Sequence, residues 1–371
     1  MNPHERFCHN AACWAYGRAG EGHIVIHSQR ERRYRCKRCG TTFSATTGTA
    51  LYRAHKPAAL VVIVVTLLAH GCPPQAVVAA YGLDERTVAR WQTEAGAHCR
   101  RLHEHLVAAG QVELAHVQAD ELRVRVVGGV VWLASAVAVR SRLWLGGVVG
   151  RQRDGALIHV LLTRVRACGA TAAALLCTDG LASYATQARR AFREAVRTGR
   201  GGRPRLVLPA GVLLAQAVKR RTKRRVVGVE RRIVRGTAAA VAARLVATQG
   251  TATAVVNTAY VERLNATFRA RLAPLTRRTR AAARELPTLE AGMWLVGTTY
   301  NLCSPQRSLR SRRGGGDPPG GKWLERTPAE MAGLTDRRWS VAELLAFPVP
   351  PPPVTHRGRP PKWLVDLRRA A

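Results

Sequence analysis

Three acidic residues stand out in this chain because of the patterns that surround them. Asp120 falls within or at the end of an apolar, strand-like segment, Asp179 ends the buried-strand pattern AAALLCTD, and Glu262 lies in a helix predicted over Ala259–Leu272. Three carboxylates that converge from separate elements repel one another unless divalent cations neutralise them, and oxygen ligands of this kind suit Mg²⁺ or Mn²⁺. Two such ions about 3.5–4 Å apart can activate an attacking hydroxyl and stabilise the leaving oxygen of a phosphodiester.

Each acid also has a structural explanation that the residues leave open. Asp120 can pair with a neighbouring arginine, and Glu121 or Asp154 can be the ligand in its place. Asp179 can be a turn residue before a glycine, and Glu262 can be a surface partner of an arginine two helical turns later. Taken together, the order of the acids and the elements that carry them favour the metal site.

The helix that carries Glu262 has two further polar positions on the same face. Asn265 and Arg269 follow at i+3 and i+7, so their side chains project from one side of the helix. In a metal site, Asn265 can orient the site or the DNA, and Arg269 can hold a phosphate near the reacting strand. We therefore predict both as DNA-binding residues.

The segments around the acids predict a mixed sheet with helices. LAHVQADELRVRVVGGVVWLASAVAVRSRLWLGGVVG has the pattern of three successive strands, with turns at Gly128 and Gly129 and at Arg140–Arg142. RDGALIHVLLTRVRACG then has the pattern of a helix, and the next segment that of a buried strand that presents Asp179 at its C-terminal end. We predict a multidomain α/β protein with this core domain at residues 111–303.

Four cysteines near the start of the chain have metal-ligand spacing. The pairs are C-x4-C and C-x2-C, separated by 22 residues: Cys8, Cys13, Cys36 and Cys39. Two such turns can bring four thiolates to one tetrahedral, structural Zn²⁺, and HIVIHSQRERRYRC between them has the alternation of a hairpin. We predict a zinc ribbon at residues 1–50. His23 and His27 are substitute ligands, and four unrelated reduced thiols are the alternative to a metal.

Residues 55–110 predict an all-α helix-turn-helix domain, supported by a third helix in PAALVVIVVTLLAHG. In PPQAVVAAYGLDERTVARWQTEAG, two prolines begin the first helix, Gly82 makes the turn and Asp84 caps the second. Val88 and Trp91 face inward. We predict that the outward-facing residues of this helix contact bases or phosphates in a major groove of DNA: Arg86, Thr87 and Arg90. An ordinary helical hairpin without DNA contact is the alternative.

The charge of the chain points to a polyanion as its partner. Its 371 residues include 59 Lys and Arg against 23 Asp and Glu, which gives a net charge of +36 and a pI of about 11.5. Such a field attracts nucleic acid, although a GC-rich genome is a second source of arginine. The N-terminus shows no signal peptide, and the longest apolar run, Ala58 to Ala69, is too short for a membrane span. We therefore expect a cytoplasmic protein without a membrane segment.

The combination of these features resembles a known family. ADE around Asp120, CTDG around Asp179 and YVERLNATFR around Glu262 are similar to segments of the DDE transposases of bacterial insertion sequences. This is the class with an N-terminal zinc ribbon, a helix-turn-helix and an RNase H-like (integrase-like) core. The last segment matches the family's Glu-Arg-x-Asn pattern, with a basic residue seven positions after the glutamate. The resemblance covers nearly the whole chain, from Cys8 to about Leu345.

The resemblance implies a DNA transposase with an RNase H-like, mixed-sheet catalytic core. Such an enzyme cleaves DNA at the element's ends and joins the freed 3′-hydroxyl to target DNA. Asp120 would bridge two Mg²⁺ or Mn²⁺ ions, and Asp179 and Glu262 would complete one site each. Because two ends must meet, it implies a homodimer or larger assembly on double-stranded DNA in the bacterial nucleoid. The rival interpretations are a non-catalytic or domesticated DNA-binding regulator and an RNase H-like nuclease that does not join strands.

One departure from a compact core is the long interval between Asp179 and Glu262. It contains a basic insertion around residues 199–236, in which KRRTKRRVVGVERRIVRG holds nine basic residues and one acid. We interpret it as a DNA-contacting excursion in the form of a strand pair, with a solvated loop inflated by the arginine bias as the alternative. The predicted contacts are its clustered cations: Lys219, Arg220, Arg221, Lys223, Arg224 and Arg225.

After the core, composition predicts a linker, a short helical segment and an extended tail. SPQRSLRSRRGGGDPPGG marks the linker at residues 304–322, and Thr327 can cap a helix begun by Pro328 within residues 323–346. The Pro- and Arg-rich tail, residues 347–371, contains RGRPPK, which resembles an AT-hook that would place Arg357 and Arg359 in a narrow minor groove. In a chain this rich in arginine, a chance match is the alternative.

Overall fold

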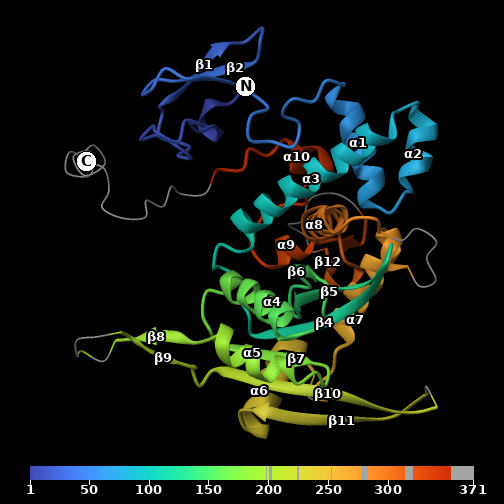
Figure 1. The fold of residues 1–371 in the computed structure, drawn as a ribbon. Helices are drawn as coiled ribbons and strands as arrows, with labels where there is room; N and C mark the ends of the chain where they lie inside the picture. Colours follow the sequence, from blue (N-terminus) through green and yellow to red (C-terminus); the bar gives the residue numbers. More distant parts are fainter. Residues whose placement is uncertain are drawn as a thin grey trace. The chain divides into compact units, whose positions relative to one another are not determined.

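The chain divides into two compact units in the computed structural model, which describes residues 1–197, 199, 203–223, 225–251, 253–276, 283–313 and 321–351. One unit comprises Met1–Arg53 and the chain from Ala346 onwards, and the other comprises Ala54–Leu345 (Figure 1). Three of the predicted DNA contacts lie outside the described residues: Arg224, Arg357 and Arg359. The side chain of Arg221 also lies outside them. No helix in the described part of the chain is both long and apolar enough to cross a membrane.

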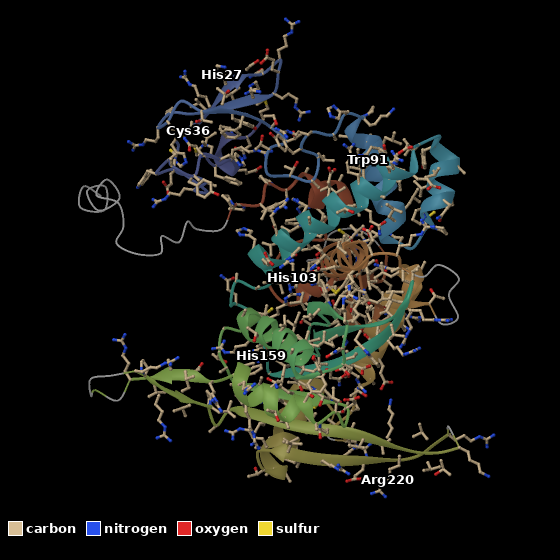
Figure 2. All side chains as sticks on the ribbon, viewed as in Figure 1. His27, Cys36, Trp91, His103, His159 and Arg220 are labelled. Atoms are coloured by element: carbon tan, nitrogen blue, oxygen red, sulfur yellow. The ribbon has the colours of Figure 1, made fainter. Side chains whose placement is uncertain are left out.

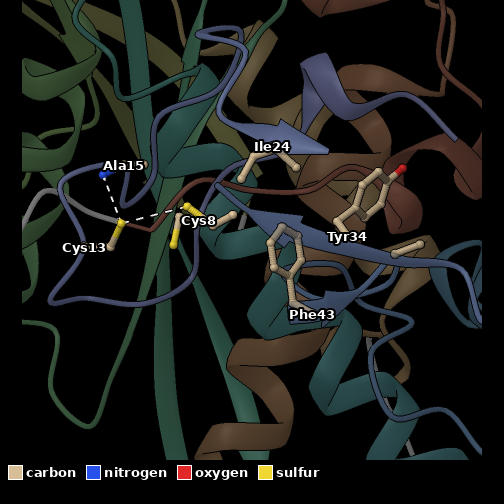
Figure 3. Close-up of a cluster of buried hydrophobic side chains, with 8 residues drawn as sticks. Cys8, Cys13, Ala15, Ile24, Tyr34 and Phe43 are labelled. Carbon is tan, nitrogen blue, oxygen red and sulfur yellow. Dashed lines mark hydrogen bonds between the residues drawn. The ribbon is translucent and has the colours of Figure 1, made fainter. Parts of the chain in front are cut away.

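The first unit is a small three-stranded antiparallel sheet. Its strands are β1 Ile24–Ser28, β2 Arg33–Cys36 and β3 Thr42–Ser44, in the order β1-β2-β3. A short 3-10 turn, Pro3–Glu5, precedes them. The hairpin expected between the two cysteine pairs is therefore present. The core of the unit is small and consists largely of three side chains and the cysteines: Ile24, Tyr34 and Phe43 (Figure 3).

The second unit begins with three helices: α1 Ala58–Ala69, α2 Pro74–Tyr81 and α3 Glu85–Leu106. The turn between α2 and α3 has the predicted chemistry. Gly82 adopts a left-handed conformation with φ of 59°, and the Asp84 carboxylate accepts hydrogen bonds from the first backbone N–H groups of α3. Val88 and Trp91 are buried as expected. The two helices, the glycine turn and the aspartate cap predicted from the sequence are therefore present.

The C-terminal half of α3 packs against α8, Leu286–Leu302. Gly96 is the contact point, because a Cβ there would lie 2.4 Å from the carbonyl oxygen of Ala291. Gly96→Ala should therefore force the two helices apart and destabilise the unit by about 1–3 kcal/mol, the usual range for overpacking. Thermal unfolding should show a lower Tm.

A matched control for this variant lies on the same helix. Ala97 is exposed, so Ala97→Ser should leave Tm nearly unchanged, as most surface substitutions do. Equal Tm values for the two variants would contradict the close approach of α3 and α8 at Gly96.

The centre of the second unit is a six-stranded mixed sheet in the order β11-β10-β7-β4-β5-β6. Its strands are β4 His116–Val126, β5 Gly129–Ala138, β6 Trp144–Gly150, β7 Ala174–Thr178, β10 Val212–Thr222 and β11 Arg225–Arg235. The first three form the antiparallel meander that the sequence predicts. The first turn is Val127–Gly128, one residue earlier than predicted, since Gly129 already begins β5, and the second lies around Arg140–Arg142. β7 then adds parallel to β4, and β10 adds parallel to β7.

Helices cover both faces of this sheet. Since successive side chains of a strand face opposite sides, His116 and Asp120 of β4 share one face. On that face lie α6 Ala238–Gln249, whose Thr248 Oγ1 is 3.2 Å from His116 Nδ1, and α7 Ala259–Arg271. On the other face α4 Gly155–Cys168 and α5 Ser183–Ala191 lie together (Figure 1).

The basic insertion differs in part from its interpretation as an excursion. Its strand pair, β10 and β11, is present, but Val212–Gln216 pair in register with Ala174–Thr178 and so belong to the central sheet. The apolar run VLLAQA explains this, because a buried parallel strand has such a composition. Only the basic part that follows extends beyond the end of β7. A separate hairpin, β8 Glu194–Val196 with β9 Arg205–Val207, precedes it.

Short elements end the described chain. β12 Ser311–Arg312 pairs with β13 Trp323–Leu324, so the segment predicted as a linker begins a small hairpin. α9 Pro328–Met331 has the predicted cap: the Thr327 hydroxyl accepts from the backbone of Glu330, whose carboxylate accepts from the backbone of Thr327. α10 spans Val341–Ala346.

Candidate functional site

Two of the three predicted acids meet at one edge of the central sheet. Asp120 lies on β4, and Asp179 directly follows β7, which runs parallel beside it. Oxygen atoms of Asp120, Asp179 and Glu121 all lie within 4.8 Å of one another. Burial raises the pKa of Asp120, and the negative charges of Asp179 and Glu262 raise it further. This cluster can bind a divalent metal ion.

Asn265 of α7 holds Asp120 in place. Its Nδ2 donates to Asp120 Oδ2 at 2.9 Å, and its Oδ1 accepts from Ser135 Oγ at 3.2 Å. Ser135 is the residue of β5 that pairs with Asp120. Asn265 is only 1% exposed, so its side chain is held between Asp120 and Ser135 in the interior.

The start of α7 is attached to β4 by Gln118, two residues before Asp120 on the same face. Gln118 Oε1 accepts from the backbone N–H groups of Tyr260 at 2.9 Å and Val261 at 3.1 Å, and its Nε2 donates to Asn257 Oδ1 at 3.1 Å. A side chain from the sheet thereby satisfies N–H groups that a helix N-terminus leaves unpaired. Glu262 follows directly, so its backbone position is fixed relative to Asp120.

Glu262 lies on the same face as Asp120 but is not part of the 4.8 Å cluster within the described residues. Its carboxylate accepts hydrogen bonds from Thr258 Oγ1 at 2.7 Å and from Lys219 Nζ of β10. It is near enough for its charge to raise the pKa of Asp120. The third acid is therefore beside the pair and exposed. Arg269, two helical turns after Glu262, is half-buried.

The two other acids that the sequence left open have separate roles. Asp154 caps α4, since its Oδ1 accepts from the backbone N–H of Leu157 at 3.0 Å. Glu121 faces α5 on the opposite side of the sheet from α7, and it accepts from Tyr184 Oη and Arg153. Sequence reasoning missed Arg153 and Tyr184, because nothing local distinguishes them from the other arginines and tyrosines.

The residues predicted to contact DNA on α3 and on the basic strand pair are largely exposed. Arg86 and Arg90 are exposed and Thr87 is half-buried on α3. We use the term ribbon for the projecting part of β10 and β11, residues 217–230. Arg220 on the ribbon has a side chain 69% exposed and pairs with Glu230 at 2.8 Å (Figure 2). Lys219, by contrast, reaches the site through Glu262, so the ribbon begins beside the carboxylates.

The four cysteines of the first unit form a tight cluster. Their sulfur atoms all lie within 4.8 Å, with 3.6 Å between Cys8 and Cys39 and 3.9 Å between Cys13 and Cys36. Zn–S bonds of about 2.3 Å in a tetrahedron require S–S distances of about 3.8 Å. Backbone N–H groups approach the sulfurs of the first pair at 3.4 Å. The cluster thus fits a structural Zn²⁺.

The histidines weighed as substitute ligands are not needed. His23 Nε2 lies 2.8 Å from the carbonyl oxygen of Arg18, and His27 is exposed on β1 (Figure 2). Neither belongs to the four-sulfur cluster.

No protein-family model matches the chain, and no curated protein matches it. The functional conclusion therefore depends on the two candidate metal sites and on the distribution of charge. One site has four sulfur ligands and no open position, which is typical of a structural metal. The other has only oxygen ligands, from two half-buried aspartates and one buried glutamate where β7 ends beside β4, and such ligands are typical of Mg²⁺ or Mn²⁺ sites.

Proposed function

We propose that this protein is a metal-dependent DNA transposase that cleaves DNA at the ends of an insertion element and transfers the freed 3′-hydroxyl to target DNA. The observation that carries the proposal is the meeting of Asp120 and Asp179 at one sheet edge, with Glu262 beside them on the same face. These acids come from a strand, the end of a parallel strand and a later helix, in that order. An antiparallel meander followed by two parallel strands supports the RNase H-like interpretation of the core.

The chemistry divides between bound metal and the chain's own residues. Two divalent cations, held by Asp120, Asp179 and Glu262, would activate the attacking hydroxyl and stabilise the leaving oxygen. Asn265 fixes the direction of the Asp120 carboxylate through its hydrogen bond. Gln118 fixes the start of α7 and thus the backbone of Glu262. The scaffold therefore holds two of the three acids through buried partners before DNA arrives.

Recognition of double-stranded DNA is supported by three separate features. The net charge of +36 attracts the phosphate backbone. The outer face of α3 and the zinc module are suited to recognising the element's terminal repeats. The ribbon extends from the sheet beside the acids, where it can follow the backbone of the reacting strand. Because two ends must be brought together, we expect a dimer or larger assembly on DNA.

The ribbon makes a prediction about salt dependence. Lys223 and Arg225 are exposed near its tip, and each phosphate contact contributes about −0.9 to the slope of log K against log salt. Replacing both residues by alanine should reduce the steepness of that slope by about 1.8 if each neutralises one phosphate. Fluorescence anisotropy with duplex DNA at several salt concentrations measures the slope.

An exposed arginine outside the ribbon provides the control for this experiment. Arg312 lies on β12, and Arg312→Ala should leave the slope within error of the parent protein. A slope unchanged in the ribbon variant would assign the basic cluster to a solvated surface.

The test of the proposed function uses the DNA that flanks the gene. A linear duplex carrying that flanking sequence, a supercoiled target plasmid and Mg²⁺ should give nicks at the element ends and covalently joined products. Joined products are the expected result. Cleavage without joining would instead support a nuclease of the same fold, and specific binding without any cleavage would support a regulator. Either of those outcomes would overturn the transposase.

A further inference from the structure

Glu121 follows Asp120 directly, yet it belongs to the other face of the sheet. Alternation along β4 directs Asp120 toward α7, where Asn265 meets it, and Glu121 toward α5, where Tyr184 meets it. The two carboxylates approach within 4.8 Å. Its distance from Asp120 therefore makes Glu121 a candidate metal ligand. Its hydrogen bonds and its burial argue against that role.

Both oxygens of Glu121 are already engaged in a buried network. Oε1 accepts from the hydroxyl of Tyr184, and Oε2 accepts from Arg153 Nε at 2.8 Å and Nη2 at 2.7 Å. The Glu121 side chain is 0% exposed, and so is Tyr184. Burial raises the pKa of Tyr184 well above its ordinary value, so its hydroxyl stays a donor. Oε2 of Glu121 thus has two donors from one guanidinium, and the side chain has no exposed surface from which a metal ion could reach Oε1.

Arg153 connects this buried network to the site. Its Nη2 also donates to Asp179 Oδ2 at 2.8 Å, while Asp179 Oδ1 accepts from the backbone N–H of Leu181 at 3.0 Å. The guanidinium carbon lies 5.3 Å from the ring centre of Trp132, which supports it from a third side. Each oxygen of Asp179 therefore has one fixed donor, and one of the two donors is a side chain that is itself held by Glu121.

We infer that Arg153 is a positioning residue for Asp179, and that Glu121 serves the site as the buried anchor of Arg153 and not as a metal ligand. Tyr184 holds Glu121, Glu121 holds Arg153, and Arg153 in turn holds Asp179. This inference rests on the proposed function, since Asp179 must hold metal for its orientation to matter. It selects Asp120, Asp179 and Glu262 as the ligand set over Asp120, Asp179 and Glu121.

The first experiment separates an anchor from a ligand by metal affinity alone. Isothermal titration calorimetry of the zinc-loaded full chain with Mn²⁺ compares Asp120→Asn, Glu121→Gln and Tyr184→Phe. A glutamine at 121 still accepts from Arg153, so its Mn²⁺ affinity should stay within about threefold of the parent, the scale of one neutral hydrogen bond. Asp120→Asn should lose at least about a hundredfold, beyond the range of outer-shell changes. Equal losses for positions 120 and 121 would make Glu121 a ligand and overturn the inference.

The second experiment tests whether Glu121 acts through Arg153. Glu121→Ala and Arg153→Ala should each reduce Mn²⁺-dependent cleavage by about 10–100-fold, the usual effect of losing an outer-shell partner. The loss should appear in the single-turnover rate at saturating DNA, with the Kd for DNA little changed. The double variant should be no slower than Arg153→Ala alone, because the two residues form one chain of contacts. A double variant whose loss of rate equals the product of the two single losses would contradict an action of Glu121 through Arg153.

Two controls keep the outcome interpretable. Thermal unfolding of each variant shows whether it folds, and Glu121→Gln and Tyr184→Phe retain the buried volume if the alanine variants do not fold. If Asp120→Asn and Asp179→Asn leave both Mn²⁺ affinity and cleavage unchanged, the proposed function itself is wrong. If those two variants lose Mn²⁺ affinity and cleavage as expected and Glu121→Gln loses them equally, only the role given to Glu121 and Arg153 is wrong.

Discussion

Replacing Asp120 or Asp179 by asparagine, or Glu262 by glutamine, should abolish Mg²⁺-dependent DNA cleavage. Loss of one metal ligand removes several kcal/mol of transition-state stabilisation, and because about 1.4 kcal/mol is a factor of ten, each rate should fall by about a thousandfold or more. Each amide has nearly the shape of the acid it replaces but lacks its negative charge. A gel assay of nicked product under single-turnover conditions measures the rate.

The same variants should bind duplex DNA as tightly as the parent, because removing a negative charge from a chain of +36 does not weaken its attraction for phosphate. Glu113→Gln makes the same change of charge at an exposed acid that precedes β4 and pairs with Arg140, and it should cleave normally. Survival of cleavage in Glu262→Gln would be the most informative contrary result. It would show that the exposed glutamate of α7 is not the third ligand.

Removal of zinc should unfold the small N-terminal sheet. The large apolar side chains buried there are few, chiefly Phe7, Ile24, Tyr34 and Phe43, and their burial is too small to offset the loss of chain entropy. A structural Zn²⁺ in a module of this size contributes about 10–16 kcal/mol, which is nearly all of its folding free energy. Chelation, or Cys36→Ser, should therefore release one Zn²⁺ per chain and collapse the amide NMR signals of β1 and β2 into the narrow range of an unfolded chain.

A cysteine outside the cluster is the control for the zinc experiment. Cys72 is half-buried and is not among the four clustered sulfurs, so Cys72→Ser should retain one Zn²⁺ and the folded signals. A chain that keeps its N-terminal NMR signals after chelation would refute the structural metal. The second unit has its own core, so its Tm should change little in either case.

Several features of the fold could be predicted because they depend on residues close together in the chain. The meander of β4, β5 and β6 follows from alternation of apolar residues interrupted by Gly128 and Gly129. The turn of the helix pair follows from Gly82 and the cap from Asp84, both of which act within one helical turn. Within the sulfur cluster, the C-x4-C and C-x2-C turns are local, whereas the contacts Cys8–Cys39 and Cys13–Cys36 join the two pairs across the chain.

Other features depended on contacts that no local pattern contains. Sheet order joins β10 to β7 and β7 to β4, so the first part of the basic insertion became a central strand and only the remainder a ribbon. The face of β4 on which each acid lies is a matter of register, and a shift of one residue exchanges Asp120 and Glu121.

The partners of the acids belong to the same non-local class. Arg153, Asn265 and Lys219 reach Asp179, Asp120 and Glu262 from loops, helices and strands far away in the chain. The three acids could therefore be recognised in the sequence, because the capacity of a carboxylate to bind metal depends on the residue itself. Which donor holds which acid was decided only when the chain folded, because that choice depends on distances in space.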